Sequence, residues 1–340
     1  MKAVVLDAVN KIESREVPVD ELKTGEVLVK IEAAGICGSD RHILHGTYPA
    51  NYPVILGHEF SGIIESAPAS SKFKVGTRVN VNPNIACGDC KYCKMGIVNL
   101  CISNWAHGVN RNGGLANYTA VPETQLFELP ASLDPKFGAL CEPLACCIQG
   151  IELAEIKSGD SVAIIGGGII GQLMVQLAEQ AGAKTVLLST RQKFRRDMAE
   201  SIGATHTIDP TNLNSNEKFT GPSGVAPGGF DVVIECAGTK ETLQQSLDIV
   251  RSGGTVILFG VMPQDEKFEI SPFDLFVRQV RIQGVFTGSK VHGKAAKMIS
   301  EGSLNLAPLI THLIGLDEVP SLLRGNPLPG EVKTLVLPND

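Results

Sequence analysis

An apolar stretch, a group of glycines and a helical pattern follow one another in the middle of the chain, and this order constrains the fold more than any other feature. Residues 161–166 (SVAIIG) form a short, nearly continuous apolar run, which is typical of a strand buried on both faces of a parallel sheet. Residues 168–182 then show helical spacing of apolar side chains and stop at Gly182. The sequence therefore predicts a strand–turn–helix unit here.

The same alternation continues along the chain. Further strands are predicted at 185–189, 205–208, 230–238 and 255–261. Further helices are predicted at 194–203 and 240–253. Strands and helices that alternate in this way imply right-handed crossovers, so we expect an α/β fold with a doubly wound parallel sheet. The segment 209–229 is rich in Asn, Ser, Pro and Gly, and we expect it to be an exposed loop.

The two ends of the chain show a different pattern. Val27, Val29 and Ile31 alternate along a predicted strand, and the segments 58–65 and 76–82 also read as short strands. A chain of 340 residues is long enough for two domains. We expect a β-rich domain over 1–150, a parallel-sheet domain over 151–289, and a return to the first domain over 290–340.

Composition and charge exclude several classes of function. Hydrophobic residues make up 43% of the chain and charged residues 19%, as in ordinary globular proteins. The formal net charge of −6 argues against nucleic acid as a partner, because proteins that neutralise phosphates usually carry a basic excess. No apolar run approaches the ~20 residues of a membrane span, and the N-terminus reaches Asp7 too soon for a signal peptide. We therefore expect a cytoplasmic protein that does not contact membranes.

Cysteine is the first residue type that points to chemistry. The chain has nine cysteines, and in a long cytoplasmic chain this favours metal binding or catalysis over disulfides. Four of them follow the spacing C-x2-C-x2-C-x7-C: Cys87, Cys90, Cys93 and Cys101. Four thiolates close the tetrahedral shell of a structural zinc ion. An iron–sulfur cluster is the alternative, since it also uses C-x2-C-x2-C.

A second set of metal-ligating side chains is spread over three motifs. Cys37 lies in GICGSDRHILHG, and His58 and Glu59 lie next to each other in GHEFSG. Glu142 lies in CEPLACC. One thiolate, one imidazole and a choice of carboxylates can supply three ligands and leave a fourth position open. That is the stoichiometry of a catalytic zinc site.

The glycines after residue 165 have the spacing of a dinucleotide-binding turn. In the pattern G-x-G-x-x-G, the first glycine makes the turn, the second lets the backbone approach a pyrophosphate, and the third allows close helix–strand packing. The preceding strand and following helix supply the context that this motif needs, with the helix N-terminus facing the anion. The residues concerned are Gly166, Gly168, Ile169, Ile170 and Gly171.

The end of the second predicted strand bears on the choice of dinucleotide. An NAD-binding chain usually places Asp or Glu there to hold the ribose 2′-OH, but this chain has Ser189 and Thr190. Arg191 and Arg195 follow, and an arginine fork can bind a 2′-phosphate. We therefore favour NADP over NAD. The alternative is that these arginines form a solvated helix face.

The motifs GICGSDRHILHG, GHEFSG, the four-cysteine segment and GGGIIG resemble the zinc-dependent medium-chain alcohol dehydrogenases in order and spacing. The likeness is closest to the branch of polyol (sorbitol) and L-threonine dehydrogenases, because EPLA places Glu142 where alcohol dehydrogenases proper have Cys. The resemblance implies a GroES-like β-rich catalytic domain and a Rossmann coenzyme domain. It also implies a homodimer or homotetramer, with one catalytic and one structural zinc.

For the site, the resemblance implies that Cys37 and His58 bind the catalytic zinc. It leaves open whether Glu59 or Glu142 is the third ligand. Ser39 and His42 match the family's hydroxyl and imidazole that pass the substrate proton outward. Asp40 lies between them, and we interpret it as a helix cap or as a residue that orients a ligand.

The implied activity is hydride transfer between NAD(P) and a secondary alcohol of a polyol or sugar-like substrate. Thr287 stands where sorbitol dehydrogenases tend to have Arg, which argues against sorbitol itself. An amino-alcohol substrate such as L-threonine is the first alternative. A relative that binds dinucleotide without catalysis is the second, and the intact set of ligand types argues against it.

Overall fold

The computed structural model describes residues 1–211 and 215–339. The chain divides into two compact units, and we describe each by itself. Unit 1 comprises residues 1–145 and 288–340, and unit 2 comprises residues 146–287. The division falls within helix α4 (Cys141–Ala154).

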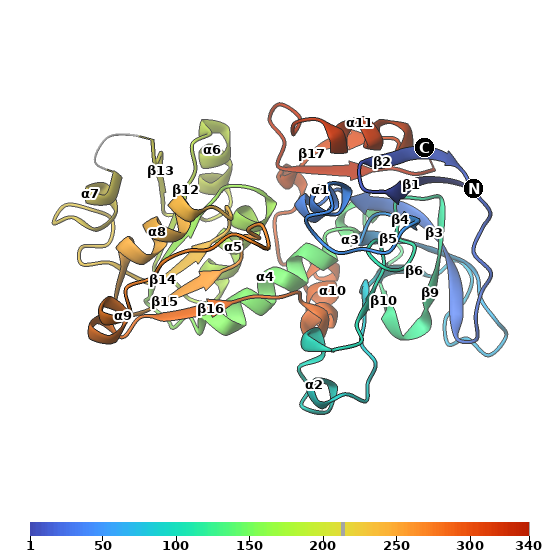
Figure 1. The fold of residues 1–340 in the computed structure, drawn as a ribbon, viewed down its shortest axis with the longest axis horizontal. Coiled ribbons are helices and arrows are strands. Elements are labelled where there is room, and N and C mark those ends of the chain that lie inside the picture. The colour runs from blue at the N-terminus through green and yellow to red at the C-terminus, as the bar shows by residue number, and fades with distance from the viewer. Residues whose placement is uncertain (212–214, 340) are drawn as a thin grey trace. The chain divides into compact units, whose positions relative to one another are not determined.

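Unit 2 is built on a six-stranded parallel sheet with the order β13-β12-β11-β14-β15-β16 (Figure 1). Its strands are β11 (Ser161–Ile165), β12 (Thr185–Ser189), β13 (His206–Ile208), β14 (Phe230–Glu235), β15 (Val250–Leu258) and β16 (Arg281–Gly284). Its helices after α4 are α5 (Ile169–Gln180), α6 (Lys193–Ser201), α7 (Ser215–Thr220), α8 (Lys240–Ile249) and α9 (Pro272–Arg278). The expected doubly wound parallel sheet is confirmed, and the strand order reverses direction at β11.

The central strand β11 is buried on both faces, as is typical of a parallel sheet. Val162, Ala163 and Ile164 are completely buried, because β12 and β14 flank the strand and helices cover its faces. Helix α5 begins after Gly168 as its N-cap, and the chain turns after it at Gly182 with a φ of +95°. The sequence pattern therefore placed this strand and helix within a few residues.

Two expectations for unit 2 are wrong. The segment 209–229 is not simply an exposed loop: it contains α7, and Phe219 is completely buried against Phe230, with ring centroids 6.5 Å apart. The helix expected over 240–253 ends at Ile249, and Val250 already belongs to β15. Val250 pairs with Phe230 on the neighbouring strand, and this tertiary pairing outweighs the local helical pattern.

Unit 1 is mostly β-structure. A seven-stranded sheet has the order β10-β6-β5-β3-β18-β17, with β9 also on β3. Smaller sheets are β2-β1-β4 and β7-β8. The strands are β1 (Lys2–Ala8), β2 (Lys11–Glu16), β3 (Glu26–Gly35), β4 (Val54–Ile55), β5 (Glu59–Ser66), β6 (Arg78–Val81), β7 (Asn84–Ile85), β8 (Trp105–Ala106), β9 (Tyr118–Pro122), β10 (Leu126–Glu128), β17 (Ile310–Ile314) and β18 (Lys333–Val336). The helices besides α4 are α1 (Gly38–Leu44), α2 (Lys91–Lys94), α3 (Pro135–Gly138), α10 (His292–Ser300) and α11 (Val319–Arg324).

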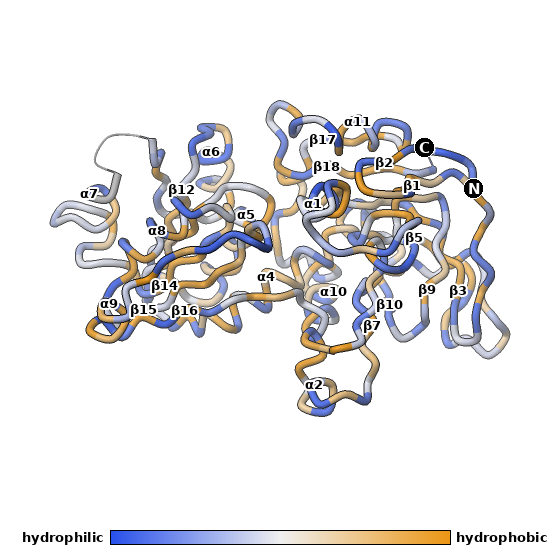
Figure 2. The backbone as a smooth tube through the Cα atoms, viewed as in Figure 1, coloured by the Kyte–Doolittle hydropathy of each residue, from blue (hydrophilic) through white to orange (hydrophobic). Residues whose placement is uncertain are grey.

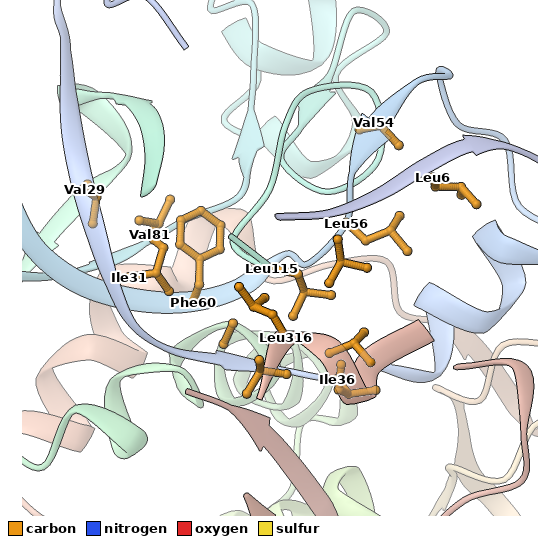
Figure 3. Close-up of a cluster of buried hydrophobic side chains, with 14 of the residues drawn as sticks. Leu6, Val29, Ile31, Ile36, Val54, Leu56, Phe60, Val81, Leu115 and Leu316 are labelled. Atoms are coloured by element: carbon orange, nitrogen blue, oxygen red, sulfur yellow. The ribbon is translucent and has the colours of Figure 1, made fainter. Parts of the chain in front are cut away.

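The core of unit 1 lies between these sheets. Leu6, Val29, Ile31, Phe60 and Leu115 are at most 1% exposed and belong to one cluster of apolar side chains (Figure 3). The alternation seen at residues 27, 29 and 31 thus marks the buried face of β3. No helix among the described residues is both long and apolar enough to cross a membrane.

Two buried histidines make the stability of unit 1 depend on pH. His292 is 1% exposed, and its Nε2 lies 2.6 Å from Oδ1 of Asn80. Burial lowers the pKa of His292 to about 3. His107 is completely buried, and burial lowers its pKa to about 4. Both side chains are therefore neutral in the folded protein at neutral pH.

The first prediction concerns His292→Gln, which keeps a donor for Asn80 but cannot titrate. The unfolded chain takes up a proton on histidine below about pH 6.5, whereas folded His292 does not, so stability falls as pH drops through this range. Between pH 7 and 4.5 the variant should lose about 2–3 kcal/mol less unfolding free energy than the unaltered protein. Urea unfolding at each pH measures this difference. Parallel curves for the two proteins would contradict the assignment.

Candidate active site

Cys37, His58 and Glu59 meet at one end of the main sheet of unit 1. β3 and β5 are antiparallel, and Gly35 at the end of β3 is paired with Glu59 at the start of β5. Cys37 follows β3 as the N-cap of α1, and His58 directly precedes β5. One ligand atom from each of the three side chains lies within 4.8 Å of the others. The register of two strands thus brings together residues about twenty positions apart.

Asp40 contacts both Cys37 and His58 and orients them. It is completely buried, its Oδ2 accepts a hydrogen bond from the Cys37 N–H at 2.9 Å, and its Oδ1 lies 3.5 Å from Nδ1 of His58. Burial lowers the pKa of His58, but the charges of Cys37 and Asp40 outweigh burial and raise that pKa above its ordinary value. With Nδ1 facing a carboxylate, Nε2 is the nitrogen available to a metal. This donor set fits a zinc ion, whose binding would release a proton from His58.

Lys333 is a site residue that sequence reasoning missed. Its ammonium pairs with Oε2 of Glu59 and donates to the Ile36 carbonyl at 2.8 Å. The Lys333 and Glu59 side chains are 1% and 2% exposed. Burial lowers the pKa of Lys333, but the negative charge of Glu59 raises it above the ordinary value. The only signal in the sequence was a lysine inside the apolar run 332–337.

The two glutamates left open by the sequence differ in position. Glu59 belongs to the cluster, although Lys333 engages one of its oxygens. Glu142 lies in the first turn of α4 and is partly buried, and the described ligand groups do not include it. Gly35 makes room for the ion pair, because a Cβ there would lie 2.0 Å from Oε2 of Glu59 and 2.8 Å from Cε of Lys333.

Ser39 and His42 lie three residues apart on α1, and residues with this spacing share a helix face. The Ser39 hydroxyl lies 3.2 Å from Nε2 of His58, so it borders the cluster directly. Nδ1 of His42 lies 3.0 Å from Oγ1 of Thr47 at a partly exposed position. Ser39 thus faces the ligand cluster, and His42 reaches toward solvent.

The four remaining predicted metal ligands gather around α2, on a separate loop of unit 1 (Figure 1). The Sγ atom of Cys93 lies 3.5 Å from that of Cys90 and 4.0 Å from that of Cys87. Thiolates at 2.3 Å from a tetrahedral zinc ion are about 3.8 Å apart, so the geometry fits such an ion. Backbone N–H groups of Cys93 and Ile102 lower the pKa of Cys90, whereas desolvation and the neighbouring Cys90 side chain raise the pKa of Cys93.

In unit 2, the glycine-rich turn has the close contacts that its motif requires. Gly166 has a φ of +112°, and a Cβ on it would lie 3.1 Å from the Ala237 nitrogen. A Cβ on Gly171 would lie 1.9 Å from the Gly166 carbonyl, so helix and strand touch at this point. Gly168 has open space beside it, and Ile169 and Ile170 begin α5. The turn therefore leaves a backbone surface free at the N-terminus of α5.

The four residues after β12 that could bear on the choice of dinucleotide differ in exposure and in their contacts. Thr190 is 8% exposed and contacts Gly167, where a Cβ would lie 2.8 Å from it. Arg191 is exposed. Arg195 is partly buried, with its guanidinium 5.6 Å from the ring centroid of Phe194. A third arginine, Arg196, is occupied, because it donates to the Thr190 carbonyl at 2.5 Å and pairs with Asp209.

Comparison with known proteins covers both units. Residues 23–131 match the family described as alcohol dehydrogenase GroES-like domain, and residues 170–301 match the family described as zinc-binding dehydrogenase. A D-altritol 5-dehydrogenase from Agrobacterium fabrum is 31% identical over 310 residues, which are 89% of each chain. An L-threonine 3-dehydrogenase from Rhizobium johnstonii is 30% identical over 89% of this chain and 88% of its own.

A solved structure resembles the whole chain. It is a zinc-binding dehydrogenase from Sinorhizobium meliloti bound to NADP, 50% identical to this chain, with a TM-score of 0.97 over 99% of both chains. The family and fold expected from the motifs are thereby confirmed. The chain belongs to the zinc-dependent medium-chain alcohol dehydrogenases.

Proposed function

We propose that this protein is a zinc-dependent oxidoreductase that transfers hydride between NADP and a secondary alcohol of a polyol or sugar-like substrate. The observation that carries the proposal is the cluster of Cys37, His58 and Glu59, with Asp40 behind it, in a chain that also has a glycine-rich dinucleotide turn. The relatives named for D-altritol and L-threonine support an alcohol as substrate.

Each residue of the cluster has a distinct task in this proposal. Cys37 and His58 hold the metal, and Asp40 fixes the ring of His58 so that Nε2 faces it. Bound zinc supplies Lewis-acid chemistry that lowers the pKa of a substrate hydroxyl. Ser39 relays the hydroxyl proton: its oxygen takes up that proton as its own proton is passed on, and His42 releases a proton toward solvent. Glu59, which groups with these two side chains, is one candidate for the third ligand, and Glu142 is the alternative.

Two zinc ions per chain are expected, with different roles. Cys93→Ser should remove the zinc of the four-cysteine loop and lower the unfolding temperature, because structural zinc contributes folding free energy. Cys37→Ser should remove the other zinc, leave a folded protein that binds dinucleotide, and abolish alcohol oxidation. Elemental analysis and thermal unfolding measure both effects. Cys146→Ser, outside both clusters, should retain two zinc ions, and iron in the unaltered protein would contradict the proposal.

The preference for NADP rests on the residues after β12. Neither Ser189 nor Thr190 can repel a 2′-phosphate, and Arg191 is exposed beside them. The Sinorhizobium meliloti relative is bound to NADP. All nine cysteines lie outside disulfides, which is typical of the reducing cytoplasm, where we propose that the protein acts.

A panel of polyols, sugar alcohols and L-threonine, assayed with NAD⁺ and NADP⁺, tests the activity and the cofactor together. We expect reduction of NADP⁺ with a polyol and a higher kcat/KM for NADP⁺ than for NAD⁺. Thr190→Asp combined with Arg191→Ala should shift this ratio about ten- to a hundredfold toward NAD⁺, because it replaces a phosphate partner with a repelling acid. A tenfold preference of the unaltered protein for NAD⁺ would refute the cofactor assignment. Dinucleotide binding without turnover of any alcohol would favour a non-catalytic relative.

We also propose that two copies of the chain associate through unit 2. Helix α9 exposes Phe273, Phe276 and Val277 at 75%, 78% and 57%, in the apolar segment visible in Figure 2. Exposed apolar side chains gathered in this way typically mark an interface. β16 ends the parallel sheet, and no described strand pairs with its outer edge. Two such edges related by a twofold axis can satisfy each other's backbone groups, which makes a second copy the fitting partner.

Charge on α9 should therefore dissociate the assembly. Phe273→Asp with Phe276→Asp places two carboxylates in the apolar patch, and light scattering after size exclusion should shift from a dimer or tetramer to a monomer. Lys294→Asp on α10 is the control: it changes the net charge by the same two units outside the patch and should leave the molar mass of the assembly unchanged. A monomeric unaltered protein would refute the proposal.

A further inference from the structure

Glu235 is a buried carboxylate in unit 2 that belongs to neither group of metal-ligating side chains. It is the last residue of β14 and is completely buried. Its Oε1 accepts three hydrogen bonds, from the N–H groups of Ala237 and Gly238 at 2.7 and 2.8 Å and from Oγ1 of Thr242 at 2.8 Å. Within the described part of the chain, no cation forms an ion pair with it. A single carboxylate oxygen thus fixes the loop between β14 and α8.

The same residue also holds the end of the next strand. The backbone carbonyl of Glu235 accepts from the N–H groups of Phe259 and Gly260, both at 2.9 Å. Gly260 has no room for a side chain, because a Cβ there would lie 2.5 Å from Oε2 of Glu235 and 2.3 Å from the Gly238 nitrogen. Glu235 therefore ties residues 236–238 to residues 259–260.

The first of these segments, residues 236–238, lies against the dinucleotide turn. The Cys236 N–H donates to the Ile165 carbonyl at 2.8 Å, and the Gly166 backbone packs on Cys236 and Ala237. Three adjacent strands of the sheet, β11, β14 and β15, thus end in segments that backbone hydrogen bonds join at Cys236 and Glu235, and the Glu235 carboxylate fixes residues 237–238 among them. In an open parallel sheet, ligands bind outside these carboxyl ends.

Burial of the Glu235 carboxylate is unfavourable for folding, which indicates that the residue has a role other than stabilising the fold. Oε2 of Glu235 has no hydrogen-bond partner among the described residues, and a buried oxygen of a carboxylate without a partner is unfavourable. The N-terminus of α8, whose first turn includes Thr242, offsets part of this cost. The benefit is a loop whose two N–H groups cannot turn away from the carboxylate.

We propose that Glu235 is a positioning residue for the dinucleotide: its carboxylate holds the segment 236–238, on which the segment 259–260 packs at Gly260, at the place from which the two segments line the coenzyme site. The inference rests on the proposed dinucleotide binding. Glu235 acts through these segments and not through its own contact with the coenzyme. Acceptance of hydrogen bonds by Oε1 is therefore the property that matters, and Gln can supply it.

The test is the dissociation constant for NADPH, measured by fluorescence on the zinc-loaded protein. Glu235→Ala should raise it at least tenfold, and Glu235→Gln should restore it to within about threefold of the unaltered value. The KM for the coenzyme should rise in parallel, while the KM for the alcohol and the zinc content stay unchanged. Asp231→Ala is the matched control at the other end of β14, where Asp231 accepts from the Ser161 N–H and from Arg251. It should lower stability without changing the dissociation constant.

A second pair of variants covers the case in which Glu235→Ala does not fold. Thr242→Val removes one donor to Oε1 and should raise the dissociation constant about threefold. Thr239→Val alters the same helix terminus at a residue that bonds with Thr242 and should leave the constant unchanged. Unchanged NADPH binding in both Glu235→Ala and Thr242→Val, or an equal loss in Asp231→Ala, would overturn the inference alone. Failure of the unaltered protein to bind NADPH or NADH would overturn the proposed function and the inference with it.

Discussion

Strand β3 is the constraint on which the candidate active site depends. It pairs with β5, β9 and β18, and its last residues lead directly to Cys37. Pairing of Gly35 with Glu59 sets the distance between the Cys37 thiol and the His58 ring, and pairing of Gly35 with Leu335 brings Lys333 to the same place. A slip of one residue in either pairing would turn these side chains to the other face of the sheet. The site is therefore specified by backbone hydrogen bonds before any metal binds.

The ion pair between Lys333 and Glu59 shows how charge is managed around this site. Asp40 and Glu59 place two buried carboxylates beside Cys37 and His58, and Lys333 supplies one positive charge next to Glu59. A buried charge without a partner is costly, so removal of Lys333 alone would leave Glu59 uncompensated. Asp40 is stabilised differently, through the N–H of Cys37 and the ring of His58. Two carboxylates thus border the same cluster with different partners.

Much of this could be predicted from sequence, because the relevant signals are local. The glycine spacing, the four-cysteine spacing and the apolar run of β11 each lie within a few residues, where turn geometry and periodicity act. The contribution of Lys333 could not be predicted, since it depends on an ion pair with Glu59, a residue 274 positions away. Glu235 was missed for another reason: the partners of its carboxylate are local, but its complete burial depends on the finished sheet and does not show in the sequence. Phe219 was misjudged because the composition of its segment hides one apolar side chain that fills the core.

The discontinuity of unit 1 has a consequence for its synthesis. Unit 2 is a continuous segment, residues 146–287, whose parallel sheet needs nothing from the rest of the chain to complete its strand order. Unit 1 lacks β17 and β18 until residues 310–336 have been made, so Ala34 and Gly35 at the end of β3 leave the ribosome without their partners on β18, although β9 already pairs with the start of the same edge. During that interval unit 2 can fold, while the main sheet of unit 1, which positions Cys37, is still incomplete. During translation, unit 2 can therefore fold before the cluster of Cys37, His58 and Glu59 is complete.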